Sequence, residues 1–269
     1  MRLNFRYQIR RWHRYLGLFA GLQFLAWSLG GLYFTWSNMD EIHGDFQRKE
    51  ATALPWQPGW VSPDKVLSQL PPQSTLLDLK VVNVLGKPTY QVKYQGHQPQ
   101  ATKGHGPQAS AATYQLADAR TGRLRPSLSR PEAIQIAKSA FIGNPEVKAV
   151  ELVTEANISG HHEYRESPLP AWAVTMDHPT NTTVYVAATL GTVNKFRNDK
   201  WRVFDFFWML HTMDYQTRDH IGNWLLRAFS IIGVLTVLSG LVLYGSSSRL
   251  LRRKKAQDYT STSKKRATT

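Results

Sequence analysis

The sequence predicts an α+β membrane protein in which two transmembrane helices flank a domain of two similar repeats, each made of a helix and antiparallel strands. Three observations lead to this fold class. Two long apolar runs lie towards the ends of the 269-residue chain, positive charge gathers outside both runs, and the polar middle repeats its own pattern. The mean hydropathy of −0.37 is close to that of a soluble protein because it averages apolar helices with a polar middle.

The first apolar run predicts a transmembrane helix over residues 12–37, preceded by a basic cytoplasmic segment over residues 1–11. Leu16 to Thr35 holds twenty residues without a formal charge, and a helix of that length spans the roughly 30 Å hydrocarbon core of a bilayer. Five arginines lie in the first fourteen residues, and positive charge is retained in the cytoplasm. A cleaved signal peptide is the alternative, but aromatic residues crowd the expected cleavage site and favour an interfacial belt.

The second apolar run predicts a transmembrane helix over residues 220–245, followed by a basic cytoplasmic tail over residues 246–269. From Arg249 the tail holds eight lysines and arginines against one aspartate, so nearly all of the net charge of +14 lies at the two ends of the chain. Both termini are therefore expected in the cytoplasm and the middle outside it. The middle has no basic groove, which argues against nucleic-acid binding. Arg227, near the start of the second run, either extends to the membrane interface or pairs with an anionic group between helices.

The middle of the chain predicts an internal duplication after a linker over residues 38–60. The two repeats cover residues 61–128 and 129–198, and each is expected to contain a helix and three strands. Each begins with a serine and a proline before a helix (Ser62, Ser129), and each ends at a turn around a glycine between β-rich runs (Gly122, Gly191). Residues 95–111 are rich in Gly, Pro, Gln and Ser, so we expect an inserted mobile loop there.

An amphipathic helix is expected over residues 199–219, at the outer surface of the membrane. Phe204, Phe207, Trp208 and His211 recur at the spacing of one helical face. The helix would lead directly into the second span.

The chain contains no cysteine, which excludes disulfides, thiolate-ligated iron–sulfur clusters and covalently attached c-type haem. It also lacks a glycine-rich fingerprint after a strand and a phosphate-binding loop, so no flavin or nicotinamide site is expected.

The segments WHRYLGLFAGLQFLAWSLGGL and WMLHTMDY, with IGNWLLRAFSIIGVLTVLSGLVLYG, resemble the two helices of PepSY-associated transmembrane (PepSY_TM) proteins. The repeats resemble PepSY units, whose helix has a P-E-x-A pattern and whose closing turn has an x-D-x-x-T-G-x pattern. Repeat one keeps Asp118, Thr121 and Gly122 in that turn, whereas repeat two has Ala187 in place of the aspartate. The resemblance covers nearly the whole chain.

This resemblance implies a protein of the bacterial inner membrane with a periplasmic central domain. Several relatives are haem-containing reductases of ferric siderophores that pass electrons from the cytoplasm to the periplasm. Those reductases have four spans and more histidine-bearing helices, whereas two spans are predicted here. The number of haem groups is therefore left open, at one or two haem b groups per dimer.

Histidines near the helix ends are the candidate axial ligands of haem iron. His13 lies at the cytoplasmic end of the first helix, on a face that continues through small residues. His211 belongs to the Leu-His pair of the motif, while His220 and His43 are weaker candidates. Arg227 is a candidate for pairing with a haem propionate. The adjacent His161 and His162 suggest a metal site, although neighbours on a strand or loop point in different directions.

His13 and His211 are expected about a bilayer apart, so they cannot bind the same iron. A twofold axis would bring each next to its copy, which predicts a homodimer with a four-helix bundle. A separate cytoplasmic reductase or the quinone pool would supply electrons, and a ferric siderophore or another periplasmic acceptor would take them. The alternatives are a membrane-anchored PepSY protein that binds or regulates a peptidase without redox activity, and a structural subunit of a larger complex.

Overall fold

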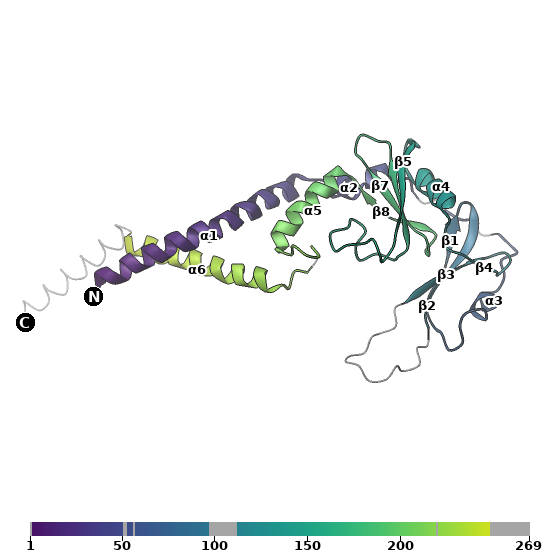
Figure 1. Ribbon diagram of the computed structural model, residues 1–269, viewed down its shortest axis with the longest axis horizontal. Coiled ribbons are helices and arrows are strands. Elements are labelled where there is room, and N and C mark those ends of the chain that lie inside the picture. The colour runs from purple at the N-terminus through teal and green to yellow at the C-terminus, as the bar shows by residue number, and fades with distance from the viewer. Residues whose placement is uncertain (1, 51–52, 56, 97–111, 219, 248–269) are drawn as a thin grey trace, which may run out of the picture. The chain divides into compact units, whose positions relative to one another are not determined.

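The computed structural model describes residues 2–50, 53–55, 57–96, 112–218 and 220–247, and these form two compact units (Figure 1). The helical unit comprises residues 1–36 and 205–269, and the sheet unit comprises residues 37–204. The predicted fold class is confirmed, since two long apolar helices flank a region with two four-stranded antiparallel sheets. The predicted loop at 95–111 and the basic tail fall almost wholly outside the described residues.

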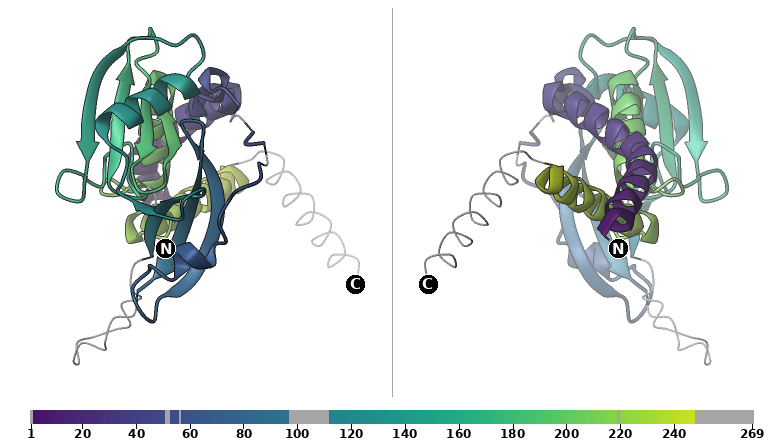
Figure 2. Two further views of the ribbon diagram at one scale, coloured as in Figure 1. Left: turned by 90° about the vertical axis from the view of Figure 1, so that its right-hand side faces the viewer. Right: turned by 90° about the vertical axis from the view of Figure 1, so that its left-hand side faces the viewer.

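The helical unit is built on two long helices, α1 (Arg2–Trp36) and α6 (Trp224–Ser247), which lie side by side (Figures 1 and 2). Tyr7–Trp36 and Trp224–Ser246 are long and apolar enough to cross a membrane, with mean hydropathies of 1.3 and 2.1. Most large apolar side chains of both helices are exposed, which is expected of a lipid-facing surface. The chain is therefore a membrane protein.

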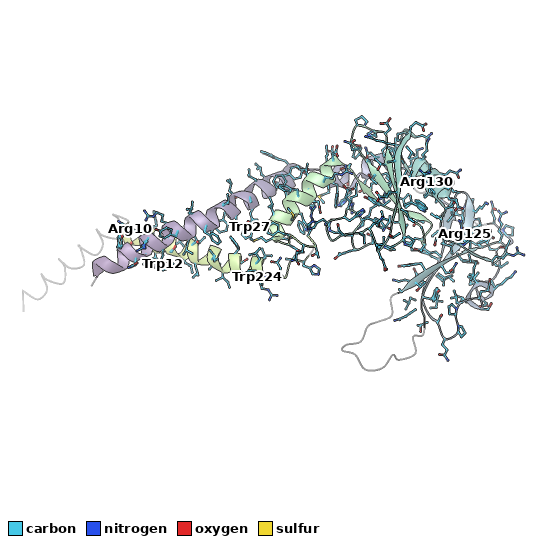
Figure 3. The ribbon with its side chains drawn as sticks, in the orientation of Figure 1. Arg10, Trp12, Trp27, Arg125, Arg130 and Trp224 are labelled. Atoms are coloured by element: carbon cyan, nitrogen blue, oxygen red, sulfur yellow. The ribbon has the colours of Figure 1, made fainter. Side chains whose placement is uncertain are left out.

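The ends of these helices follow from local chemistry. Helix α1 begins ten residues before the predicted span, because the charged residues ahead of the apolar run continue the helix. Helix α6 begins four residues after the predicted span does, because the Asn223 side chain accepts a hydrogen bond from the Leu226 N–H at 2.8 Å and caps the helix there. In Figure 3, Arg10 and Trp12 lie near the start of α1, Trp27 lies in its second half and Trp224 begins α6.

Helix α5 (Asp199–Thr212) starts in the sheet unit and ends in the helical unit, seven residues before the end of the predicted interfacial helix. The chain leaves the helix at Met213, whose φ of 52° is left-handed. Asp214 then organises a loop, because its carboxylate accepts hydrogen bonds from several following residues.

The sheet unit opens with two short helices, α2 (Met39–His43) and the 3₁₀ helix η1 (Asp45–Gln47). The first repeat follows with α3 (Asp64–Leu67), β1 (Thr75–Val84), β2 (Lys87–Gln95), β3 (Thr113–Asp118) and β4 (Leu124–Arg125). The second has α4 (Arg130–Ala140), β5 (Val147–Val153), β6 (Ala171–Met176), β7 (Thr183–Ala187) and β8 (Thr192–Arg197). Each sheet is an antiparallel meander with its strands in chain order.

The repeats begin as predicted, but each has four strands rather than three, because the chain continues to pair after its closing turn. The Ser129 and Glu132 side chains form a reciprocal capping box at the start of α4. Gly191, in the second closing turn, has a φ of +73°, and a Cβ there would lie 2.9 Å from Val84 Cγ2. Only glycine fits this close approach of the second repeat to the first.

The second sheet has two different faces. Side chains of α4 pack on one face with Val174, Val184 and Val186. Alternate residues of the same strands, including Ala173 and Tyr185, point the other way and pack beneath the loop of residues 154–170. This second face is only partly covered, and a hollow remains on it.

Candidate functional site

His13 projects from α1 onto α6, where its Nδ1 lies 2.8 Å from the Ser239 hydroxyl. The Ser239 hydroxyl donates its one hydrogen to the Thr236 carbonyl, also at 2.8 Å. The His13 imidazole is therefore held through Nδ1. No hydrogen-bond partner of Nε2 is found in the described part of the chain. A histidine held through Nδ1 can offer Nε2 to a metal.

Glycines of α6 provide the space for this contact. A Cβ at position 240 would lie 3.2 Å from His13 Cε1, and one at position 233 would lie 2.9 Å from Phe24 Cζ. The small residues predicted to follow His13 on one face of α1 have different surroundings. Ala20 is buried, whereas Gly17 and Gly21 have open space where a Cβ would lie. The helix contact therefore uses glycines of α6, and the Gly17 and Gly21 positions remain open within one chain.

His211 lies in the last turn of α5, among aromatic side chains of the helical unit. Its ring centroid is 6.0 Å from that of Trp27, 6.2 Å from that of Phe34 and 6.2 Å from that of Trp208. A cavity of about 240 Å³ adjoins the ring and is lined by Trp27, Trp208, His211, Thr212, Ile221 and Leu226. No hydrogen bond of the ring nitrogens is found among the residues that the structure describes, so packing holds this imidazole.

Two side chains of α1 donate hydrogen bonds to the backbone at the end of α5. The Trp27 indole N–H donates to the His211 carbonyl at 3.1 Å, and the Gln23 amide donates to the Leu210 carbonyl at 2.8 Å. These are two carbonyls that the end of a helix leaves without an intrahelical donor. Polar side chains of the apolar α1 helix thus fix the position of His211.

His220 lies before α6 in a loop held by Asp214. The Thr217 hydroxyl donates to the Asp214 carboxylate, and its oxygen is hydrogen-bonded to His220 Nδ1 at 2.6 Å. Burial alone raises the pKa of the Asp214 carboxyl, but hydrogen bonds from Thr217 and from the backbone N–H groups of His220, Thr217 and Gln216 hold it well below its ordinary value. The His220 side chain is 70% exposed.

Arg227 is exposed on α6, and no ion pair of its side chain is found in the described ranges. Its Nη2 lies 3.7 Å from where a Cβ of Gly222 would be, so the guanidinium reaches back beyond the start of the helix. This direction agrees with extension towards the interface.

The structure does not bring His13 and His211 together. His211 contacts Trp27 and Phe34, which follow His13 by fourteen and twenty-one residues of α1, or about 21 to 32 Å along the axis. His220 lies nearer to the His211 end, because the Asn223 amide donates to the carbonyls of both Thr212 and His220. The helical unit therefore separates His13 from His211, and the two positions are named the inner and the outer site after the predicted topology.

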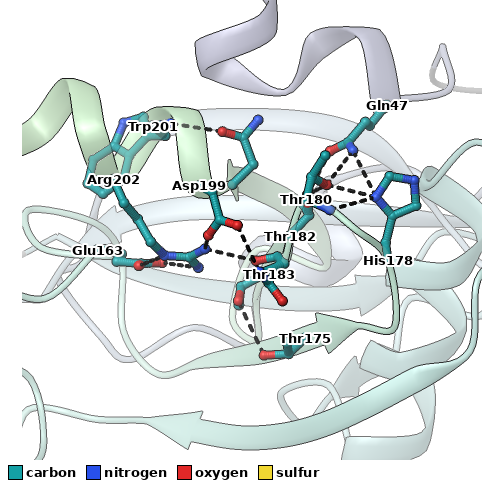
Figure 4. Close-up of polar contacts among 12 residues, drawn as sticks. Gln47, Glu163, Thr175, His178, Thr180, Thr182, Thr183, Asp199, Trp201 and Arg202 are labelled. Carbon is teal, nitrogen blue, oxygen red and sulfur yellow. Dashed lines mark hydrogen bonds and ion pairs between the residues drawn. The ribbon is translucent and has the colours of Figure 1, made fainter.

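Histidines of the sheet unit have other surroundings. His43 lies 4.0 Å from Asp45, and His178 Nδ1 is hydrogen-bonded to Thr180 at 2.7 Å in a polar cluster with Gln47 (Figure 4). His161 and His162 line a hollow on the second sheet. No group of three or more metal-binding side chains occurs among the described residues, so the adjacent histidines form no such cluster there.

The family model of the PepSY-associated TM region matches residues 10–266. The chain belongs to the PepSY-associated transmembrane family. The match includes both apolar helices, both repeats and the candidate histidines of this PepSY_TM protein. Comparison with curated proteins and with solved structures gives no match.

Sequence reasoning missed the neighbours that define the two sites. The sequence indicates only that Ser239 is a small residue at a helix contact. It indicates only that Trp27 belongs to an aromatic belt. The loop residues Asp214 and Thr217 carried no signal at all. A serine one helical turn after a threonine in an apolar run is a weak sign of a polar contact, but nothing in the sequence pairs it with His13.

Proposed function

We propose that this PepSY_TM protein is a b-type haem protein of the bacterial inner membrane. It transfers electrons from a cytoplasmic donor or the quinone pool to a periplasmic acceptor, namely ferric iron or a ferric siderophore. The observation that carries the proposal is the hydrogen bond between His13 Nδ1 and the Ser239 hydroxyl, which leaves Nε2 without a hydrogen-bond partner among the described residues. Metal-binding histidines generally have their second nitrogen held in this way.

Imidazole donors next to apolar surroundings suit a haem group at both sites. At the inner site, His13 would supply a nitrogen ligand, and the open positions at Gly17 and Gly21 leave room beside α1. At the outer site, His211 would supply an imidazole beside an apolar, aromatic cavity. Arg227 extends on the α6 side towards the outer end, where it would pair with a propionate. His220 is an additional imidazole there.

Haem held by two imidazoles would need a second histidine at each site, and the structure keeps His13 and His211 apart. A twofold homodimer would supply each site with the same residue from a second copy, and four spans would then form a bundle. The exposed apolar surface of both helices gives such a dimer its contact area in the bilayer.

Haem would supply a one-electron carrier at each site. One electron taken from the donor reduces one ferric ion to ferrous iron. A quinol donor gives two electrons and releases two protons, and so reduces two ferric ions. The chain's own residues hold the imidazoles in place, and the basic residues at both ends of the chain keep the termini in the cytoplasm.

A membrane-anchored binding or regulatory protein without redox activity is the second candidate. The hollow of about 420 Å³ on the second sheet favours it, since a binding protein needs such a surface.

The test uses proteoliposomes that contain the purified protein and trapped dithionite, with ferric citrate and a ferrous-specific chelator outside. We expect a reduced-minus-oxidised b-type spectrum and a rise in external ferrous iron. His13→Ala should abolish most of the rise, whereas His161→Ala, at an exposed position of the sheet unit, should leave it unchanged. Protein expressed with ample haem that shows no b-type spectrum would overturn the proposal in favour of the second candidate.

A further inference from the structure

The second sheet carries a hollow of about 420 Å³ on the face opposite α4. Its floor is made of alanine and threonine side chains from three adjacent strands (Ala149, Ala173, Thr175, Thr183). The Thr175 and Thr183 hydroxyls hydrogen-bond to each other at 3.2 Å (Figure 4). Larger side chains at these four positions would fill the space. The hollow therefore exists because the strands carry small residues there.

Hydrogen bonds hold the walls of this hollow in place. The Arg202 guanidinium donates to Glu163 through Nε at 2.5 Å and Nη2 at 3.3 Å (Figure 4). The Tyr185 hydroxyl also donates to Glu163, at 3.4 Å, and the Tyr164 N–H donates to His162 Nδ1 at 3.0 Å. Burial, with the nearby Glu163 charge, raises the pKa of Tyr185, so its hydroxyl stays protonated. The walls are therefore arranged before any ligand arrives.

One carboxylate of the lining is available for a cation. Arg202 is the positive group of the lining, and its guanidinium is paired with Glu163. Glu151 is the other carboxylate of the lining and lies on β5, and no ion pair of its side chain is found among the described residues. A ligand with one positive group would be attracted to Glu151.

Strand β5, which borders the hollow, is the first strand of its sheet and pairs on one side only within the described chain. The Asn157 amide donates to the Leu152 carbonyl at 2.8 Å. Since outward-facing backbone groups alternate along an antiparallel strand, those of Val150 and Leu152 face the open edge. Such an edge can accept a further strand.

We propose that an extended segment of another protein pairs with the open edge of β5 and places a lysine or arginine side chain in the hollow, towards Glu151. Recognition of such a segment needs both the open edge of β5 and the hollow. The edge binds any extended backbone, whereas the carboxylate-lined hollow selects a basic side chain at one position of the added strand. The proposal goes beyond electron transfer and does not depend on haem.

The test uses the full-length protein in lipid nanodiscs and a short, end-blocked peptide of alternating valine and threonine with a central lysine. Two matched peptides carry glutamate at the centre or a proline beside the lysine. We expect the lysine peptide to slow amide exchange at Val150 and Leu152 more strongly than the glutamate peptide, and the proline peptide to have the smallest effect. Glu151→Gln should weaken its binding by about three- to five-fold, whereas Glu155→Gln, a carboxylate of the adjacent loop that does not line the hollow, should leave it unchanged.

Three results would overturn the proposal. One is equal binding of the lysine and glutamate peptides, which would show that the hollow selects no charge. Another is unchanged exchange in β5 with every peptide. The last is protection of β5 that rises with protein concentration alone, which would assign the edge to a second copy of this chain. Because these readouts need no haem, they are independent of the spectral test above.

Discussion

The two ends of the helical unit hold their histidines in different ways. At the inner end, a hydrogen bond to the Ser239 hydroxyl orients the imidazole of His13. At the outer end, three aromatic rings surround the imidazole of His211, and the hydrogen bond from Trp27 goes to its backbone carbonyl instead of its ring. A polar contact thus holds the inner imidazole, whereas packing holds the outer one.

Because their imidazoles are held differently, the two sites should respond to different substitutions. A polar substitution on α6 should affect the inner site alone, and a change in packing or in the loop of Asp214 should affect the outer site alone. Since the sites lie about 21 Å or more apart along α1, such effects should be separable and nearly additive.

The largest effect is expected from Gly240→Val. A Cβ at this position already lies 3.2 Å from His13 Cε1, and two further methyl groups would displace the imidazole. We expect the inner haem to be lost while the outer haem is retained, as measured by haem-to-protein ratio and absorption spectra. Gly222→Ala is the control, because a Cβ there meets only the flexible end of Arg227. Full haem content in Gly240→Val would show that His13 is not an inner ligand.

A smaller effect is expected from Ser239→Ala, which removes the hydrogen-bond partner of His13 Nδ1. Loss of such an outer contact lowers metal affinity by about ten-fold or more. We expect weaker haem binding and a shifted reduction potential, and Ser239→Thr should restore both because it keeps the hydroxyl. The control is Ser230→Ala, since the Ser230 hydroxyl is bonded only to its own helix at the Leu226 carbonyl. A potential that stays unchanged in Ser239→Ala would remove the basis for the inner site.

The smallest effect concerns the loop of the outer end. The folded-state pKa of Asp214 lies below its ordinary value, so its ionised form stabilises the fold above about pH 4, and this stability is lost as the pH falls through the folded-state pKa. Asp214→Asn should speed amide exchange in residues 214–220 by about five-fold at pH 7. The difference from the wild type should shrink at lower pH, whereas an unchanged difference down to strongly acidic pH would exclude this electrostatic role.

The sequence predicts most of the fold, because the patterns that specify it are local. Uncharged runs identify the spans, and the serine-proline openings identify the repeats before their structure is known. The fourth strand of each repeat was missed because β4 is only two residues long and β8 follows a turn that looks like an end. Helix α5 stops at Thr212 because of the loop held by Asp214, and its aromatic spacing gives no sign of that stop.

The candidate site could be predicted only in part. His13 and His211 were identifiable from their motifs and their places at the helix ends. Ser239 and Gly240 could not be connected with His13, because more than two hundred residues separate them in the chain and only the packing of α1 on α6 brings them together. The register of that packing depends on side-chain shape along both helices, which periodicity alone does not determine.

Haem ligation by these histidines is tested most directly by electron paramagnetic resonance of the oxidised, haem-loaded protein, compared with His13→Ala and His211→Ala. We expect low-spin ferric signals from two histidine-ligated sites in the wild type. His13→Ala should lose one of these signals and His211→Ala the other, with the remaining signal unchanged in each variant. Wild-type spectra that persist in both variants would contradict the assignment of these histidines to haem iron.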